Sequence, residues 1–261
     1  MVFIDVHCHL TYEPIISKID EVIENARYSN VKDIITNGTN PETNRLAIDF
    51  SKKYSEVKYA LGYYPTYIQE LSEKELDKEI EFIRKSKPIA IGEVGLDYKF
   101  NSEEYPTNLT EQQIETYKQK QKKGFQKFID LAKDLDLPII VHSRKAELDV
   151  IEMLEASKHD KIVMHCFCGK KKYVQRVLEN NWYVSVPVTV IKLQQFQEMV
   201  KKAKLSQLLT ETDSPWLGPE PGLDNEPKNV KLTIEKIAEI KGFNEKEIED
   251  QIYLNYTRLF L

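Results

Sequence analysis

The chain alternates between short apolar runs and longer charged stretches, and this alternation limits the folds that it can adopt. The short runs are rich in β-branched residues and hydrophobic almost throughout, which is typical of parallel strands that are buried on both faces. The longer stretches carry apolar residues at helical spacing, which predicts amphipathic helices. Eight strands are expected, at residues 3–6, 31–36, 57–61, 89–94, 137–141, 161–164, 182–186 and 207–210.

A helix is expected after each of these runs. Two of the helices begin with a capping box, in which Ser72 precedes Glu75 and Thr110 precedes Gln113, so that each hydroxyl stands three residues before a Glu or Gln. The expected helices lie near residues 16–29, 42–54, 73–86, 110–135, 145–158, 170–180, 191–204 and 229–241.

Eight strand–helix units within 261 residues indicate an α/β protein of a particular kind. Barrels of eight such units commonly reach about 250 residues as one domain. We therefore predict a (β/α)8 TIM barrel that forms a single domain over residues 1–261. A further amphipathic helix, over roughly 245–257, is expected to pack outside the barrel as an extra C-terminal helix.

The charge of the chain excludes one mode of binding. The net charge is −5 and the pI is about 5.7, so tight non-specific binding to duplex nucleic acid through bulk charge is not expected. Any contact with nucleic acid must then be local, and two lysine-rich stretches, 118–127 and 170–172, are candidates for it. We favour the simpler interpretation, that both are solvated helix faces.

The cysteines and the apolar segments indicate a compartment. The chain has three cysteines, Cys8, Cys166 and Cys168, which is no disulfide framework. The first residues lack the features of a signal peptide, and no apolar run approaches the roughly 18 residues of a membrane span. A cytoplasmic protein is expected, with no membrane association and no obligate protein partner.

Histidine and acidic side chains stand where the expected strands end. The C-terminal ends of barrel strands converge on one face, where active sites are built. A single buried histidine is more often a core residue than a ligand, but the set as a whole predicts a metal site. His159, the fifth histidine of the chain, lies in a charged stretch and is expected to be exposed. The six candidate ligands are His7 and His9 at the end of the first strand, Glu93 at the end of the fourth, His142 at the end of the fifth, His165 at the end of the sixth and Asp213 at the end of the eighth.

These residues can hold one or two divalent ions. His7 and His9 are two apart, so both imidazoles project to the same side and can hold one ion together with Glu93. Glu93 can bridge to a second ion, because each carboxylate oxygen can face one cation. His142 and His165 would complete that second site, and Asp213 the first. We expect Mg²⁺, Mn²⁺ or Zn²⁺; imidazoles suit zinc and manganese, whereas magnesium prefers oxygen ligands.

The two cysteines that flank candidate ligands are interpreted as packing residues. Cys8 and Cys166 each neighbour a histidine, and adjacent residues on a strand point to opposite faces. We therefore expect both to be small packed side chains rather than ligands.

Six blocks of the sequence, taken together, resemble the signature blocks of the TatD family of metal-dependent deoxyribonucleases, and they occur in the family's order along the whole chain. This resemblance implies an amidohydrolase-like metal barrel with deoxyribonuclease activity. It also implies a ligand set that maps onto the same six residues. The blocks are DVHCHL at 5–10, GEVGLDY at 92–98, LPIIVHSR at 137–144, MHCFCG at 164–169, ETDSP at 211–215 and NYTRLF at 255–260.

The sequence also departs from the family pattern at positions that concern the substrate. Tyr64 stands in Gly62-Tyr-Tyr-Pro65, where the family pattern implies a histidine that contacts the substrate phosphate. Gly222 and Leu223 stand where an Arg-Gly pair is usual, and the block 184–188 lacks the usual glycine. Two potential phosphate-binding cations are therefore missing, although Arg144 remains. These changes leave the metal chemistry intact and put the substrate in doubt.

The expected reaction is the hydrolysis of phosphodiester bonds by metal-activated water. Asp213 would orient the water and accept its proton, and Glu93 would fix the spacing of the ions; these two are the expected catalytic residues. The expected substrate-binding residues are Arg144 as a donor to the phosphate, and Tyr64, Tyr98 and Trp216 as surfaces for a base or sugar.

The expected substrates are DNA ends or single-stranded nucleic acid, cleaved by 3'-5' exonuclease action. An alternative is a metal-dependent hydrolase of an ester or amide, such as an aminoacyl-tRNA deacylase, which the missing cations favour. A non-catalytic metal-binding scaffold is a third reading. The complete ligand set argues against it, since a structural site is usually closed by four ligands.

Overall fold

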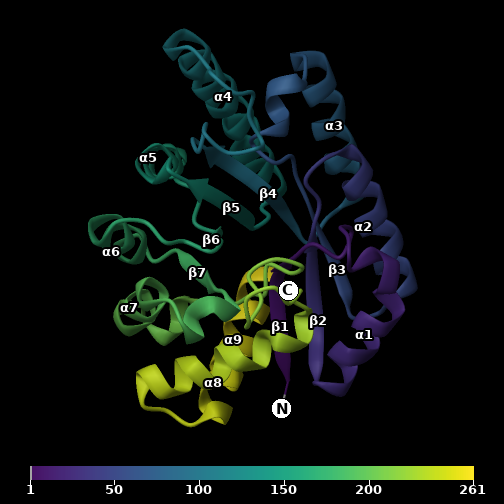
Figure 1. Cartoon of the computed structure of the whole chain (residues 1–261), viewed down its shortest axis with the longest axis vertical. Helices are drawn as coiled ribbons and strands as arrows, with labels where there is room; N and C mark the ends of the chain where they lie inside the picture. The colour runs from purple at the N-terminus through teal and green to yellow at the C-terminus, as the bar shows by residue number, and fades with distance from the viewer. Residues whose placement is uncertain (1) are drawn as a thin grey trace.

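The computed structural model describes residues 2–261, in which eight parallel strands alternate with helices around a barrel (Figure 1). Each strand pairs in parallel with the next one along the chain. The predicted (β/α)8 TIM barrel is thus confirmed. The strands are β1 (Phe3–Cys8), β2 (Val31–Asn37), β3 (Val57–Leu61), β4 (Ala90–Asp97), β5 (Ile139–Arg144), β6 (Ile162–Met164), β7 (Tyr183–Val186) and β8 (Leu208–Thr210).

The helices form the outer layer and begin where the sequence signals place them. Ser72 accepts a hydrogen bond from the Glu75 amide, and Thr110 accepts one from the Gln113 amide, so both predicted capping boxes are present. The α-helices are α1 (Ile19–Tyr28), α2 (Pro41–Lys53), α3 (Glu73–Ser86), α4 (Glu111–Leu135), α5 (Glu147–Ser157), α6 (Lys171–Glu179), α7 (Gln194–Lys202), α8 (Val230–Lys241) and α9 (Glu245–Phe260). Short 3₁₀ helices are η1 (Ile16–Lys18), η2 (Tyr67–Glu70), η3 (Val188–Ile191), η4 (Leu205–Gln207) and η5 (Pro227–Asn229).

The barrel closes between its first and last strands through the residues that follow β8. The amide of Asp213 donates to the carbonyl of His7 over 2.9 Å, and the amide of His9 donates to the carbonyl of Ser214 over 2.7 Å. These two bonds hold the segment after β8 against the end of β1. The contacts that close the barrel therefore also place Asp213 beside the two histidines.

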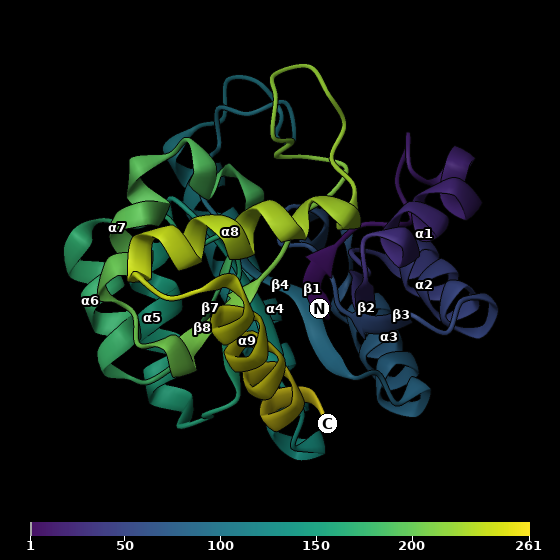
Figure 2. The same ribbon diagram turned by 90° about the horizontal axis from the view of Figure 1, so that it is seen from below.

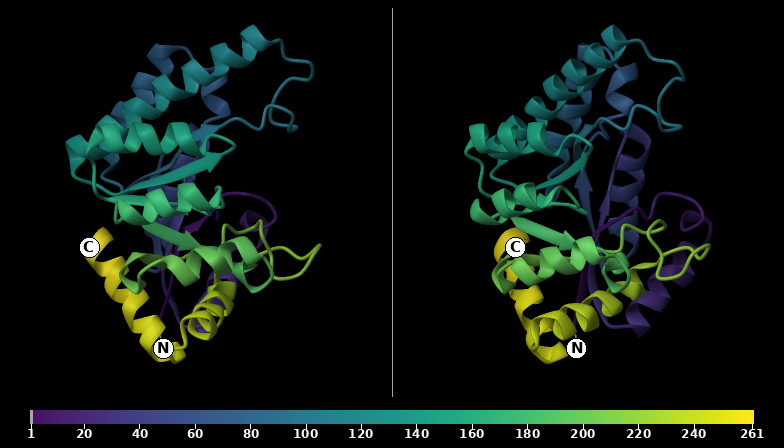
Figure 3. Two further views of the ribbon diagram at one scale, coloured as in Figure 1. Left: turned by 90° about the vertical axis from the view of Figure 1, so that its left-hand side faces the viewer. Right: turned by 60° about the vertical axis from the view of Figure 1, so that its left-hand side comes forward.

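Helix α9 closes the end of the barrel opposite the long loops. Figures 2 and 3 show the loops at 98–110 and 214–226 projecting from one face, whereas α9 lies across the other. The predicted extra C-terminal helix is confirmed, and it lies over the barrel floor rather than in the outer ring. Its apolar residues join those inside the barrel in one buried cluster, made of Ile4, Val6, Ile35, Ala60, Ala90, Ile140, Val163, Leu209, Tyr256, Leu259 and Phe260.

Removing the largest buried side chain of α9 is expected to destabilise the whole barrel. Tyr256 is fully buried, so Tyr256→Ala would leave a cavity at the barrel floor and lower the free energy of unfolding by about 3–5 kcal/mol. Urea unfolding followed by circular dichroism measures the loss. Leu254 on the same helix is 40% exposed, and Leu254→Ala is the matched control, with an expected loss below about 1 kcal/mol. Equal losses in the two variants would contradict the role of Tyr256 in filling the barrel floor.

One expectation about the histidines is wrong. His159 is only 8% exposed, and its Nε2 lies 3.0 Å from the carbonyl oxygen of Leu137. Burial lowers the pKa of His159. The segment between α5 and β6 packs against the start of β5, which the charged neighbours of His159 did not reveal.

The cysteines and the apolar character of the helices can be compared with the sequence expectations. All three cysteines are free; Cys8 is fully buried, and its thiol lies 3.5 Å from the carbonyl oxygen of Ile35. Within residues 2–261, no helix combines the length and apolar character that crossing a membrane requires.

Candidate metal centre

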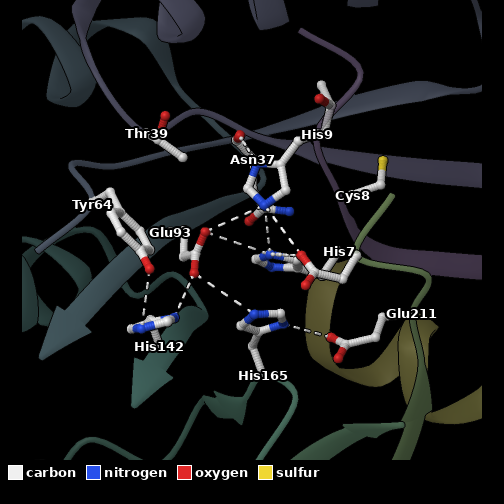
Figure 4. Close-up of polar contacts among 12 residues, drawn as sticks. His7, Cys8, His9, Asn37, Thr39, Tyr64, Glu93, His142, His165 and Glu211 are labelled. Atoms are coloured by element: carbon white, nitrogen blue, oxygen red, sulfur yellow. Dashed lines mark hydrogen bonds and ion pairs between the residues drawn. The ribbon is translucent and has the colours of Figure 1, made fainter. Parts of the chain in front are cut away.

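Five of the six candidate ligands meet at the C-terminal face of the barrel, with Glu93 between two pairs of histidines (Figure 4). Its Oε2 lies 3.3 Å from Nε2 of His9 and 3.7 Å from Nε2 of His7. Its Oε1 lies 2.9 Å from Nδ1 of His142 and 3.7 Å from Nε2 of His165. Each carboxylate oxygen thus faces one histidine pair, which is the arrangement of a bridging ligand.

Asp213 joins the cluster from the last strand. Its Oδ1 lies 3.4 Å from Nε2 of His9 and 3.6 Å from Nε2 of His7. The backbone of Asp213 has a φ of 55°, a left-handed conformation that aspartate and asparagine adopt more readily than most residues. Its side chain remains 15% exposed and lines the cavity above the cluster.

The ligand atoms fall into three groups, each with atoms within 4.8 Å of one another. Nitrogen and carboxylate donors at such spacing fit a divalent transition ion, and two groups that share one carboxylate fit a pair of ions. The groups are His7 with His9 and Glu93; Glu93 with His142 and His165; and His7 with His165 and Asp213.

Three of the histidines are oriented by partners that sequence reasoning did not identify. Nδ1 of His165 lies 2.9 Å from Oε2 of Glu211, and Nε2 of His142 lies 3.0 Å from Oδ2 of Asp97. Nδ1 of His9 lies 3.1 Å from a backbone carbonyl oxygen. Such contacts fix the imidazole so that its other nitrogen faces the centre. Glu211 stands two residues before Asp213 in the strand-eight block, and this spacing was the available signal for it.

The charges of the cluster are mutually compensated. Burial lowers the pKa of His9, but hydrogen bonds with Asp213 and Glu93 outweigh burial and raise it to about 9. Burial likewise lowers the pKa of His165, but the charge of Glu211 helps to raise it to about 10. A cation that binds here must displace protons from the imidazoles, so metal affinity is expected to increase with pH.

Neutralising the partner of His165 is expected to weaken metal binding. Glu211 is fully buried, and Glu211→Gln keeps its size while removing the charge that supports His165. Metal affinity, measured by competition with a chelator, should decrease by about 10–100-fold. Glu226 is also buried but pairs with Lys18 and Lys228, so Glu226→Gln is the matched control. Unchanged affinity in Glu211→Gln would contradict an orienting role for this carboxylate.

A cavity of about 400 Å³ lies over the cluster of candidate ligands. Of the four predicted substrate-binding residues, Tyr64, Arg144 and Trp216 line it. Tyr98 is not among the lining residues found in the described part of the chain. Its hydroxyl donates to Asp149 over 2.9 Å, and its ring stacks on Phe100. The structure therefore separates Tyr98 from the other three.

Two aromatic residues that the sequence analysis missed also line the cavity. Tyr12 lies beside Trp216, with ring centroids 5.4 Å apart, and Tyr67 lies beside Tyr64, with centroids 5.8 Å apart. Trp216 is 47% exposed, which is unusual for a side chain of this size. The cavity thus has aromatic surfaces on which a planar group can stack. Cys166 and Cys168 also line it; Cys166 packs against the core as expected, but only in part.

Arg144 is held in place by two carboxylates. Its Nε donates to Oδ2 of Asp97 over 2.5 Å, and its guanidinium also forms an ion pair with Glu104. Among the described residues that line the cavity, Arg144 is the only lysine or arginine. The hydroxyl of Tyr64 lies 3.3 Å from the same oxygen of Asp97, and burial raises the pKa of Tyr64 well above its usual range. The phenol therefore stays protonated and can act as a neutral donor.

The structure shows where the remaining departures from the family pattern lie. Ser185, in the block without glycine, donates to Glu211 over 2.5 Å and so supports the partner of His165. Gly222 has a φ of 79° and Leu223 is 60% exposed, both in the loop after β8. These changes leave the metal cluster intact.

Comparisons with known proteins agree with this geometry. Residues 4–261 match the model of a family described as TatD related DNase. The chain is 34% identical to an uncharacterized metal-dependent hydrolase, MJ1582, of Methanocaldococcus jannaschii, over 99% of this chain and 96% of that protein. It is 31% identical to human deoxyribonuclease TATDN3, over 98% of this chain and 94% of that protein. The crystal structure of YjjV, a TatD homologue from Escherichia coli, superposes with a TM-score of 0.85 at 24% identity, covering 99% of this chain and 97% of the other.

Proposed function

The chain belongs to the family of TatD related DNases and is a metal-dependent hydrolase, and on this premise we propose that it hydrolyses phosphodiester bonds in DNA. The observation that carries the proposal is the position of Glu93, with one oxygen toward His7 and His9 and the other toward His142 and His165. A pair of divalent ions at such a site can stabilise both the attacking and the leaving oxygen of a phosphoryl group.

The proposed roles of the side chains follow from where they lie. Divalent ions held by the six residues would lower the pKa of a water molecule and offset the charge of the phosphate. Asp213 faces both His9 and the cavity, so its carboxylate can orient the attacking water and accept its proton. Arg144 and Tyr64 line the same cavity and can donate hydrogen bonds to phosphate oxygens.

We propose that the enzyme acts on strand ends, as a 3'-5' exonuclease. The cavity of about 400 Å³ has room for a terminal nucleotide, and its aromatic rings suit a splayed base better than a paired one. The acidic net charge of −5 gives the molecule no general attraction for duplex DNA. A cytoplasmic location and action without a protein partner remain predictions of the sequence.

A turnover assay tests the proposal. Metal-stripped protein is reloaded with Mg²⁺, Mn²⁺ or Zn²⁺ and incubated with single-stranded DNA labelled at its 5' end. Stepwise shortening that requires metal would establish the nuclease activity, and products that keep the 5' label would establish 3'-5' polarity. Absence of cleavage in protein shown to contain metal would overturn the proposal.

One observation favours a second candidate, the hydrolysis of an ester or amide such as an aminoacyl-tRNA. The guanidinium of Arg144 is already paired with Asp97 and Glu104, and Tyr64 carries no positive charge. A substrate whose reacting group is an uncharged acyl ester would need no free cation in the cavity. Cleavage of an aminoacyl ester, without cleavage of DNA, would identify this activity.

A further inference from the structure

The two lysine-rich stretches of the chain differ in their surroundings. In α4, the lysines at 118–127 are mostly engaged by other groups. Lys122 pairs with Asp149 over 2.8 Å, Lys123 pairs with Glu73, and Lys127 pairs with Asp77. The charges of this stretch are therefore compensated within the protein, as expected of a solvated helix face.

The lysines at 170–172 lack such partners. Lys170, Lys171 and Lys172 are all exposed, and none forms an ion pair with an acidic residue within 2–261. They stand at the start of α6, whose first turn contains no acidic residue. Cations are unfavourable at this end of a helix, because the helix dipole is positive there. The stability of α6 therefore does not explain why three lysines lie at its start.

One of these lysines, Lys171, lines a groove on the outside of the barrel, and Lys170 and Lys172 are its neighbours in sequence. Helices α6 and α7 are neighbours in the outer layer of the barrel (Figure 1). Residues of both helices line the groove, which has a volume of about 430 Å³. Gly169 lines the groove, and the preceding residue, Cys168, lines the metal cavity. The cavity and the groove are therefore separated by one residue step along the chain, about 3.8 Å between neighbouring Cα atoms, so a flexible polymer held at the metal centre has the groove within reach.

The lining of the groove suits a single nucleic-acid strand. Lys171 and Lys202 supply positive charge, and Leu193, which is 43% exposed, supplies an apolar surface. The carboxylate that lines the groove, Glu198, is paired with Lys201 over 3.0 Å. Positive charge along the backbone path and apolar surface for bases are the two features that single-strand binding requires.

We propose that this groove, with the lysines at 170–172, binds the part of a single-stranded DNA substrate that extends beyond the nucleotide at the metal centre. The inference rests on the proposed nuclease function and assigns the path of the strand. It replaces, for 170–172 only, the reading of both lysine stretches as solvated helix faces. The scissile phosphate lies at the cavity, and the groove contributes affinity that depends on strand length.

The test compares two triple variants that remove the same charge. The first combines Lys170→Gln, Lys171→Gln and Lys172→Gln; the matched control combines Lys122→Gln, Lys123→Gln and Lys127→Gln. Binding of fluorescent single-stranded DNA is measured by anisotropy, with a dinucleotide and with an oligonucleotide of about 12 nucleotides. Hydrolysis of bis(p-nitrophenyl) phosphate reports on the metal centre alone, and melting temperatures report on folding.

The first variant should bind the longer oligonucleotide about 10-fold more weakly, and its slope of log Kd against log salt should decrease by about 2. The dinucleotide affinity and the hydrolysis of the small diester should stay at parental values, and the control variant should match the parent throughout. If the first variant binds the longer oligonucleotide with parental affinity and still hydrolyses the small diester, the proposed role of the groove is wrong, and the proposed function is unaffected. Failure of the parent to hydrolyse either substrate would overturn the proposed function and the groove with it.

Discussion

Asp213→Asn is expected to reduce kcat by about 10²–10⁴-fold, the contribution typical of a general base. Asparagine keeps the shape of the side chain and tolerates the left-handed backbone, with φ at 55°, that this position requires. The fold and the metal content should therefore stay close to those of the parent. The loss would be confined to the proton acceptor that faces both the cavity and His9.

The measurements are turnover on single-stranded DNA, metal content by mass spectrometry and melting temperature. Asp224→Asn is the matched control, because Asp224 is an exposed residue of the same β8 loop and does not line the cavity among the described residues. Turnover at the parental rate in Asp213→Asn would remove Asp213 from the mechanism. A large loss of bound metal would instead make it mainly a ligand.

Glu93→Gln is expected to abolish measurable activity and to lower the metal content. A neutral amide cannot offer two anionic oxygens to the two histidine pairs that Glu93 now faces. Each ion contributes several kcal/mol to the transition state, so a decrease of about 10³-fold or more in kcat/KM is expected. Metal stoichiometry should decrease by at least one ion per chain relative to the parent.

Metal titration and turnover of the same preparations test this prediction. Glu220→Gln, which changes an exposed glutamate of the β8 loop, is the matched control and should retain parental stoichiometry. If Glu93→Gln binds the parental number of ions with parental affinity, Glu93 is not a bridging ligand. The two-ion reading of the site would then have to be abandoned.

The fold was predictable because each local pattern agrees with the same architecture. The eight apolar runs have the length of buried parallel strands, and the stretches between them have helical spacing, so the barrel follows from arithmetic. The ligands were predictable for the same reason. Barrel closure brings strand ends together, so His7 near the start of the chain and Asp213 near its end had to become neighbours.

What the sequence did not reveal depends on loops and on side-chain direction. Arg144 is the last residue of β5, but its partner Glu104 comes from a loop 40 residues away in sequence, so the sequence pattern does not reveal the pairing. Tyr98 directly follows β4, the strand that carries Glu93, yet its side chain points toward Asp149. No periodicity encodes which way a side chain turns after its strand has ended.

The hydrogen bonds that join His7 to Asp213 and His9 to Ser214 have a consequence for synthesis of the protein. A ribosome makes the aspartate more than 200 residues after the two histidines. The helix that fills the barrel floor, α9, is made later still. A nascent chain that has not yet reached Asp213 therefore carries an incomplete centre, and a hydrolase built in this way is inactive until that residue has been added.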